Sequence, residues 1–112
     1  MTEARWAAEV RKMNQVFPWF RAIERDHWVG FKGDLKGPKG TVYSVEVLAN
    51  KNTYPAMPPR IWLRPPFGAN RLSDGSLCIS RAWRPDRDTF AQQILYAAAY
   101  LEYQQKLSEL DR

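Results

Sequence analysis

Cys78 is the only cysteine of the chain and the residue best suited to covalent chemistry. It lies in the stretch Asn-Arg-Leu-Ser-Asp-Gly-Ser-Leu-Cys-Ile-Ser, residues 70–80, after a proline-rich segment and before Trp83-Arg84-Pro85. A lone thiol in this setting is either a small buried side chain or a nucleophile. Residues 67–85 show little periodicity, and a long irregular stretch in a small domain is more often functional than idle. We therefore favour the nucleophile.

A helix is expected on the N-terminal side of this stretch, over residues 3–17. Apolar side chains recur there at helical spacing, and Pro18 ends the run. They are Trp6, Val10, Met13 and Phe17. This pattern predicts an amphipathic helix with one face against a core.

Strand-like segments follow the helix between Phe20 and about Leu63. They are residues 28–35, broken by Gly30 and Gly33, then 41–48 after the turn 37–40, and finally 60–63. Prolines within residues 54–59 predict a stiff, extended connection to the last strand. The pattern indicates an antiparallel meander.

A second helix is predicted to start after Asp86 or Asp88, either of which can cap it, and to run to about Leu110. The chain is therefore expected to have an α+β fold: an N-terminal helix, an antiparallel sheet of about four strands and a long C-terminal helix. At 112 residues and 45% hydrophobic composition, residues 1–112 fit a single domain that needs no disulfide.

Composition also bears on location and partners. No apolar run approaches the roughly 20 residues that cross a bilayer, and no signal segment is recognisable, so a cytoplasmic protein without membrane contact is expected. The formal charge of +5 is scattered along the sequence, which makes nucleic acid an unlikely partner and leaves acidic proteins at least as well supported. His27 has no second histidine or nearby cysteine, so no metal site is expected.

The order of motifs resembles the catalytic core of ubiquitin-conjugating enzymes over roughly residues 5–105. The matching features are Gly37-Pro38 followed by Thr41 and Tyr43, Tyr54-Pro55 with Pro58-Pro59, Asn70 eight residues before Cys78, Gly75 three before it, and Trp83 with Pro85 after it. Each motif alone is weak, and their joint order and spacing carry the resemblance. The cadence of residues 73–78 resembles the short bacterial members found beside cyclic-oligonucleotide synthases in antiphage operons.

The resemblance implies a thioester carrier of the transferase class. Cys78 would accept the C-terminal carboxyl of a ubiquitin-like or similarly tailed donor protein and pass it to an amine on a target protein. In the antiphage type the donor would resemble the tail of the cyclic-oligonucleotide synthase, with or without a separate activating enzyme. No bound cofactor is implied.

Asn70 matches the family's asparagine, which would donate to the developing oxyanion, although asparagine also favours turns for unrelated reasons. The residues expected to support the site are Asp74, Gly75, Ser80, Trp83 and Pro85. Asp74-Gly75 is interpreted as a turn, whereas Trp83 and Pro85 are expected to pack beneath the site.

The sequence departs from the family at three places. Gly68-Ala69 replaces the usual His-Pro, Ala56 replaces a ligase-binding hydrophobic residue, and Ser80 stands where an acidic residue is common. Two other functions therefore stay open: a catalytically silent adaptor of the same fold, and a basic nucleic-acid-binding module.

Overall fold

The computed structural model describes residues 1–66, 72, 74–77 and 82–110. Its first element is helix α1, Glu3–Val16, close to the predicted range. Thr2 caps the helix by accepting a hydrogen bond from the Arg5 backbone N–H at 3.1 Å. Met13 is buried and Trp6 and Val10 pack against the core, as the spacing of these residues predicted.

Four antiparallel strands follow in the spatial order β1-β2-β3-β4, which confirms the predicted meander. The strands are β1 Arg21–Arg25, β2 Trp28–Lys36, β3 Val42–Asn50 and β4 Arg60–Arg64. The predicted break of the second strand at Gly30 and Gly33 is wrong, because β2 runs unbroken through both. Gly33 leaves room for the ring of Phe20, which would lie 2.5 Å from a Cβ atom at that position.

The connection between β3 and β4 is not the extended segment that its prolines suggested. Residues 51–57 form turns, because the Asn50 carbonyl accepts the backbone N–H groups of Thr53 and Tyr54 at 3.2 and 2.9 Å. The Asn50 side chain also accepts the N–H of Asn52 at 2.8 Å. These local hydrogen bonds from one asparagine outweigh the extended preference before proline.

Helix α2 spans Phe90–Leu110, and its cap differs from the prediction. Thr89 caps it by accepting the Gln92 N–H at 3.1 Å, whereas Asp88 accepts the Arg84 N–H at 2.7 Å and Asp86 lies on the exposed surface. The Asp88 carboxylate is therefore engaged in the loop before the helix, and the adjacent threonine takes the capping position.

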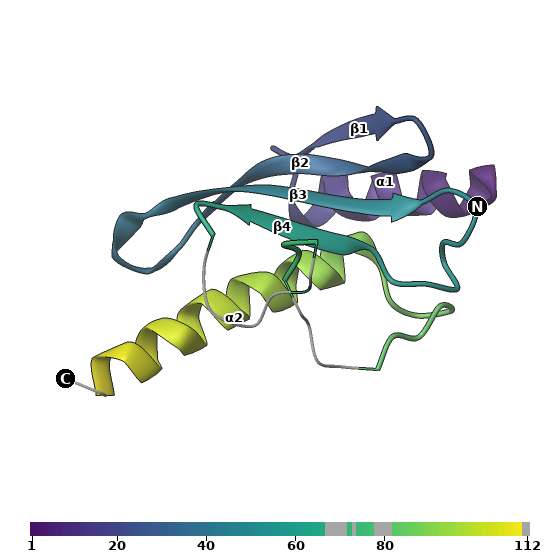
Figure 1. Ribbon diagram of the computed structural model, residues 1–112. Coiled ribbons are helices and arrows are strands. Elements are labelled where there is room, and N and C mark those ends of the chain that lie inside the picture. Colours follow the sequence, from purple (N-terminus) through teal and green to yellow (C-terminus); the bar gives the residue numbers. More distant parts are fainter. Residues whose placement is uncertain (67–71, 73, 78–81, 111–112) are drawn as a thin grey trace.

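Both helices lie on the same side of the sheet, and α2 runs on past it (Figure 1). The core forms between this side and the helices: Phe31 contacts Trp6 of α1 at a ring distance of 5.1 Å and Phe90 of α2 at 5.4 Å. The strand residues of the core alternate with those that face away from the helices, and on that opposite face Gly30 and Leu48 are also buried. One face of the sheet is therefore committed to the core, and we call the opposite one the outer face.

Candidate functional site

Three of the residues predicted for the site, Asn70, Cys78 and Ser80, lie outside the described residues. The two segments that flank Cys78, residues 74–77 and 82–90, are described. These segments hold the chain on either side of the candidate nucleophile.

The segment before Cys78 forms a turn centred on Asp74 and Gly75, as the sequence predicted. Asp74 Oδ1 accepts hydrogen bonds from the Ser76 backbone N–H at 2.9 Å and from its hydroxyl at 2.6 Å. Gly75 has a φ of 86°, which favours glycine. The two bonds from Ser76, with the Arg60 guanidinium beside the carboxylate, lower the pKa of Asp74 to about 2. The turn is thus locked by a carboxylate that is ionised near neutral pH.

Leu77, the residue immediately before Cys78, is fixed to the edge of the sheet. Its backbone N–H donates to the carbonyl of Ile61 in β4 at 2.8 Å, and its side chain is buried. Leu77 also lines a pocket of about 350 Å³ between the β3–β4 connection and the turn. The residue immediately before Cys78 is therefore held in place by a backbone hydrogen bond to β4 and by burial of its side chain.

On the far side of the candidate nucleophile, Trp83 and Pro85 behave differently from each other. The Trp83 indole donates to the carbonyl of Pro55 at 2.7 Å, and its ring lies 5.9 Å from that of Tyr54. Pro85 is exposed, and its carbonyl accepts a hydrogen bond from Arg5 at 2.6 Å. Its predicted packing beneath the site stays a prediction, because Cys78 lies outside the described residues. The loop before α2 is held through its backbone carbonyls rather than by burial of the proline.

A buried charged cluster, absent from the predictions, lies at the base of this loop. Glu9 of α1 is 1% exposed, and its Oε2 accepts the Tyr54 hydroxyl at 2.6 Å and the Phe90 N–H at 3.1 Å. Burial raises the pKa of the Glu9 carboxyl, against the lowering effect of its hydrogen bonds and of Arg5. Burial and the neighbouring Glu9 also raise the pKa of Tyr54. The phenol therefore stays protonated and acts as a donor to Glu9.

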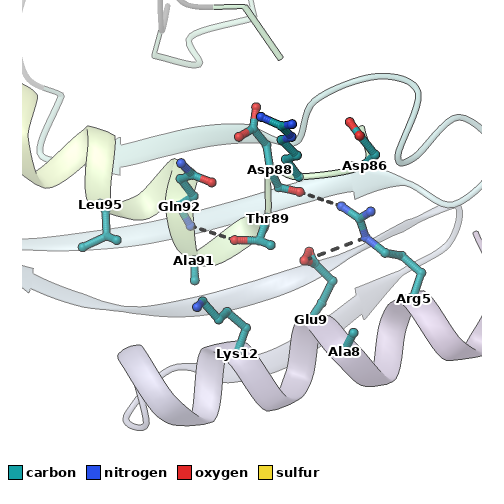
Figure 2. A pocket seen from close by; sticks show the side chains of 11 residues that line it. Arg5, Ala8, Glu9, Lys12, Asp86, Asp88, Thr89, Ala91, Gln92 and Leu95 are labelled. Carbon is teal, nitrogen blue, oxygen red and sulfur yellow. Dashed lines mark hydrogen bonds and ion pairs between the residues drawn. The ribbon is translucent and has the colours of Figure 1, made fainter. Parts of the chain in front are cut away.

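Arg5 completes the cluster. Its Nη2 donates to the Tyr54 oxygen at 3.1 Å. The same nitrogen donates to the carbonyl of Asp88 at 2.6 Å, and Nε lies 3.9 Å from Glu9 Oε1 (Figure 2). Figure 2 shows these groups at one end of a pocket between α1 and the start of α2, with Lys12 further along α1. The cluster joins α1, the β3–β4 connection and the loop that follows the candidate nucleophile.

The sequence did contain one signal for this cluster. Glu9 stands three residues after Trp6 and four before Met13, which places a carboxylate within the apolar stripe of α1. A charge at such a position must find partners if the stripe is buried. Its partners Tyr54 and Phe90 are 45 and 81 residues away, and no local pattern names them.

Comparison with protein-family models, with curated proteins and with solved structures finds no match. Within the described ranges, no three His, Cys, Asp or Glu side chains are grouped so that they could hold a metal ion. Neither helix, over the residues that the structure describes, combines the length and apolar character needed to cross a membrane.

Proposed function

We propose that this protein is an acyl carrier of the ubiquitin-conjugating type, with Cys78 as its nucleophile. The observation that carries the proposal is the ordered set of motifs around Cys78, from Gly37-Pro38 through Asn70 to Trp83 and Pro85. The described fold supports it in a coarser way. A helix, a four-stranded meander and a second helix occur in the order that the resemblance implies.

In the proposed reaction the Cys78 thiolate attacks the activated C-terminal carbonyl carbon of the donor protein. A carbon–sulfur bond forms, and the activating group leaves with its electron pair: a nucleotide if the donor is adenylated, or a thiolate if an activating enzyme delivers it. An amine of the target then attacks the same carbon. An amide bond forms, the Cys78 thiolate departs, and the amine loses a proton to solvent or to a base.

The anchored surroundings of Cys78 are suited to this chemistry. The hydrogen bond from Leu77 to Ile61 and the Asp74 turn fix the chain on one side, and Trp83 with the Arg5 cluster fixes it on the other. Such flanking order limits the entropy that must be lost when a donor tail is bound for attack. Asn70 is proposed to donate to the oxyanion.

The test is mass spectrometry of the protein after co-expression with the proteins encoded beside it. A protein-sized adduct that disappears on reduction is expected for the native chain, and none for Cys78→Ala. Cys78→Ser should give either no adduct or an oxyester that survives the reductant, because an alkoxide is a poorer leaving group than a thiolate.

Alkylation supplies the control, because the chain has one cysteine and any modification reports on it alone. A reactive thiol should be alkylated by iodoacetamide in the folded protein at neutral pH. An unreactive Cys78 together with no adduct, in the presence of the candidate donor and any activating enzyme, would favour the silent adaptor instead.

A further inference from the structure

Six of the seventeen basic residues of the sequence gather on the outer face of the sheet. Side chains of successive strand residues point to opposite faces, and the core takes one set. The register aligns the residues of the outer face across neighbouring strands. Arg21 lies beside Lys32, Lys32 beside Glu46, and Glu46 beside Trp62. The basic side chains of this face are Arg21, Arg25, Lys32, Lys36, Arg60 and Arg64, and the acidic ones within the strands are Asp34 and Glu46.

Part of this charge is neutralised within the protein. Glu46 accepts both terminal nitrogens of Arg25, at 2.8 and 3.0 Å, and lies 3.6 Å from Lys32. Arg60 pairs with Asp74. Among the described residues, the other three cations of this face, Arg21, Lys36 and Arg64, make no ion pair. They stand on three different strands, so the unneutralised charge is spread along the face rather than concentrated at one point.

Two tryptophans share this face with the cations. Trp62 stands beside Glu46 in the register, and its indole N–H donates to the Asp74 carbonyl at 3.2 Å. Trp28 begins β2 opposite Asn50 and is 36% exposed. Flat aromatic side chains among arginines and lysines on a sheet are the arrangement on which single-stranded nucleic acids stack their bases.

The outer face continues into the 350 Å³ pocket, because Trp28, Asn50 and Arg60 line both. Exposed Met57 and Leu72 add apolar surface, and Thr53 adds a hydroxyl. Gln93 lies among the lining residues at 5% exposure, and its Oε1 has no hydrogen-bond partner in the described structure. Buried hydrogen-bond acceptors in folded proteins almost always have a donor, so this oxygen points to a ligand that supplies the missing donor.

We propose that the outer face and this pocket bind single-stranded nucleic acid. One base enters the pocket against Trp28, where Asn50, Thr53 and Gln93 offer hydrogen-bonding groups to its polar edge. The backbone phosphates lie along the three unpaired cations. The pocket distinguishes this ligand from an acidic protein, because carboxylates would meet the surface cations but would leave the half-apolar pocket and its unpaired acceptor unused.

The experiment is fluorescence anisotropy with labelled 12-nucleotide DNA and RNA strands at several salt concentrations. With three phosphates neutralised at about 0.7 released counterions each, the logarithm of affinity should fall with the logarithm of salt with a slope of about −2. Lys36→Gln with Arg64→Gln should reduce the slope to about −0.7. Trp28→Ala should weaken binding about tenfold at constant salt, because one stacked base is lost.

Matched controls lie on other parts of the molecule. Arg11→Gln with Lys12→Gln removes the same charge from the exposed side of α1. Trp19→Ala removes an exposed indole from the connection between α1 and β1, which donates to the Asp34 carbonyl and does not line the pocket. Both controls should bind as the native protein does, and circular dichroism should show all variants folded.

Three results would overturn the proposal. The first is no binding even at low salt, and the second is a Trp28→Ala variant that binds as well as Trp19→Ala. The third is polyglutamate of equal charge competing as strongly as the oligonucleotide, which would assign the face to an acidic protein partner. None of these results bears on Cys78 alkylation or adduct formation, so the two proposals fail independently.

Discussion

At the scale of single residues, Glu9 has the most consequential environment in the described structure. A carboxylate that is almost fully buried loses its hydration, and the protein compensates with a phenol, a backbone N–H and a guanidinium. The phenol of Tyr54 and the N–H of Phe90 come from segments far from α1 in the chain, whereas Arg5 lies one turn earlier on α1 itself. The carboxylate therefore acts as a junction between α1, the β3–β4 connection and the start of α2, and its removal should destabilise all three segments.

Replacement of Glu9 should separate its role as an acceptor from its charge. Glu9→Ala leaves the Tyr54 hydroxyl and the Phe90 N–H without their acceptor and Arg5 without its counter-ion, and it should lower the free energy of unfolding by about 3 kcal/mol. Glu9→Gln keeps an acceptor for Tyr54 and Phe90 and should cost less. Urea denaturation at pH 7 measures both, with exposed Glu3→Ala as the control. Equal losses of unfolding free energy for Glu9→Ala and Glu9→Gln would contradict the role of Glu9 as a hydrogen-bond acceptor at this junction.

The same variants carry a pH signature. Burial raises the pKa of Glu9 above 4.5, so the folded protein holds a proton that the unfolded chain releases. The contribution of Glu9 to stability is then full below pH 4.5 and is lost as pH rises through the folded pKa. Glu9→Gln lacks this loss, so its stability relative to the native protein should improve with rising pH over that window. A difference that stays constant with pH would refute this account.

At the scale of elements, the neighbouring polar residues at the start of α2 accept hydrogen bonds from different backbone N–H groups. Asp86, Asp88 and Thr89 can all cap a helix, and the choice depends on which of them the preceding loop already uses. Asp88 bonds the Arg84 N–H and closes that loop, so Thr89 caps. The first turn of α2 is thereby fixed at Phe90, whose N–H meets Glu9.

Thr89→Ala should lower the free energy of unfolding by about 1 kcal/mol, because the Gln92 N–H loses its acceptor. Asp86→Ala, three residues away and exposed, should change it by less than about 0.5 kcal/mol. Thermal or urea unfolding of the two variants side by side decides the assignment. A larger loss for Asp86→Ala would restore the cap that the sequence suggested.

At the scale of the whole molecule, Arg5 links the N-terminal helix to the loop before α2. Its guanidinium bonds carbonyls 80 and 83 residues away and the Tyr54 hydroxyl 49 residues away. Its planar, forked donors suit three acceptors at once, which a lysine ammonium does not reproduce in the same geometry. The N-terminal helix thus secures the segment that follows the candidate nucleophile.

Arg5→Lys should therefore loosen residues 84–90 more than the sheet. Hydrogen–deuterium exchange is expected to speed up for the backbone N–H groups of Arg87 and Asp88, which bond Arg84 within this loop, while β2 and β3 exchange as before. Arg11→Lys on the exposed side of α1 serves as the control. A uniform increase across the sheet would mean that Arg5 supports global stability rather than this loop.

The order helix, antiparallel meander, helix could be read from the sequence. Apolar spacing located both helices, and alternation and turn residues located β3, β4 and, apart from the wrongly predicted break, β2. The range of β1 was not predicted. The predicted antiparallel α+β fold was confirmed, because these signals come from residues close together in the chain. The chemistry assigned to Cys78 also comes from the sequence, through its motifs and their spacing.

Contacts between residues far apart in the chain could be learned from the three-dimensional fold alone. Glu9 with Tyr54 and Phe90, Arg5 with the loop before α2, and the cations gathered on the outer face all depend on contacts between distant segments. The turns of residues 51–57 and the capping by Thr89 were also beyond reach, since each arose from competition among several local hydrogen bonds. A pattern reports what a segment prefers, whereas burial and pairing depend on which other segments it meets.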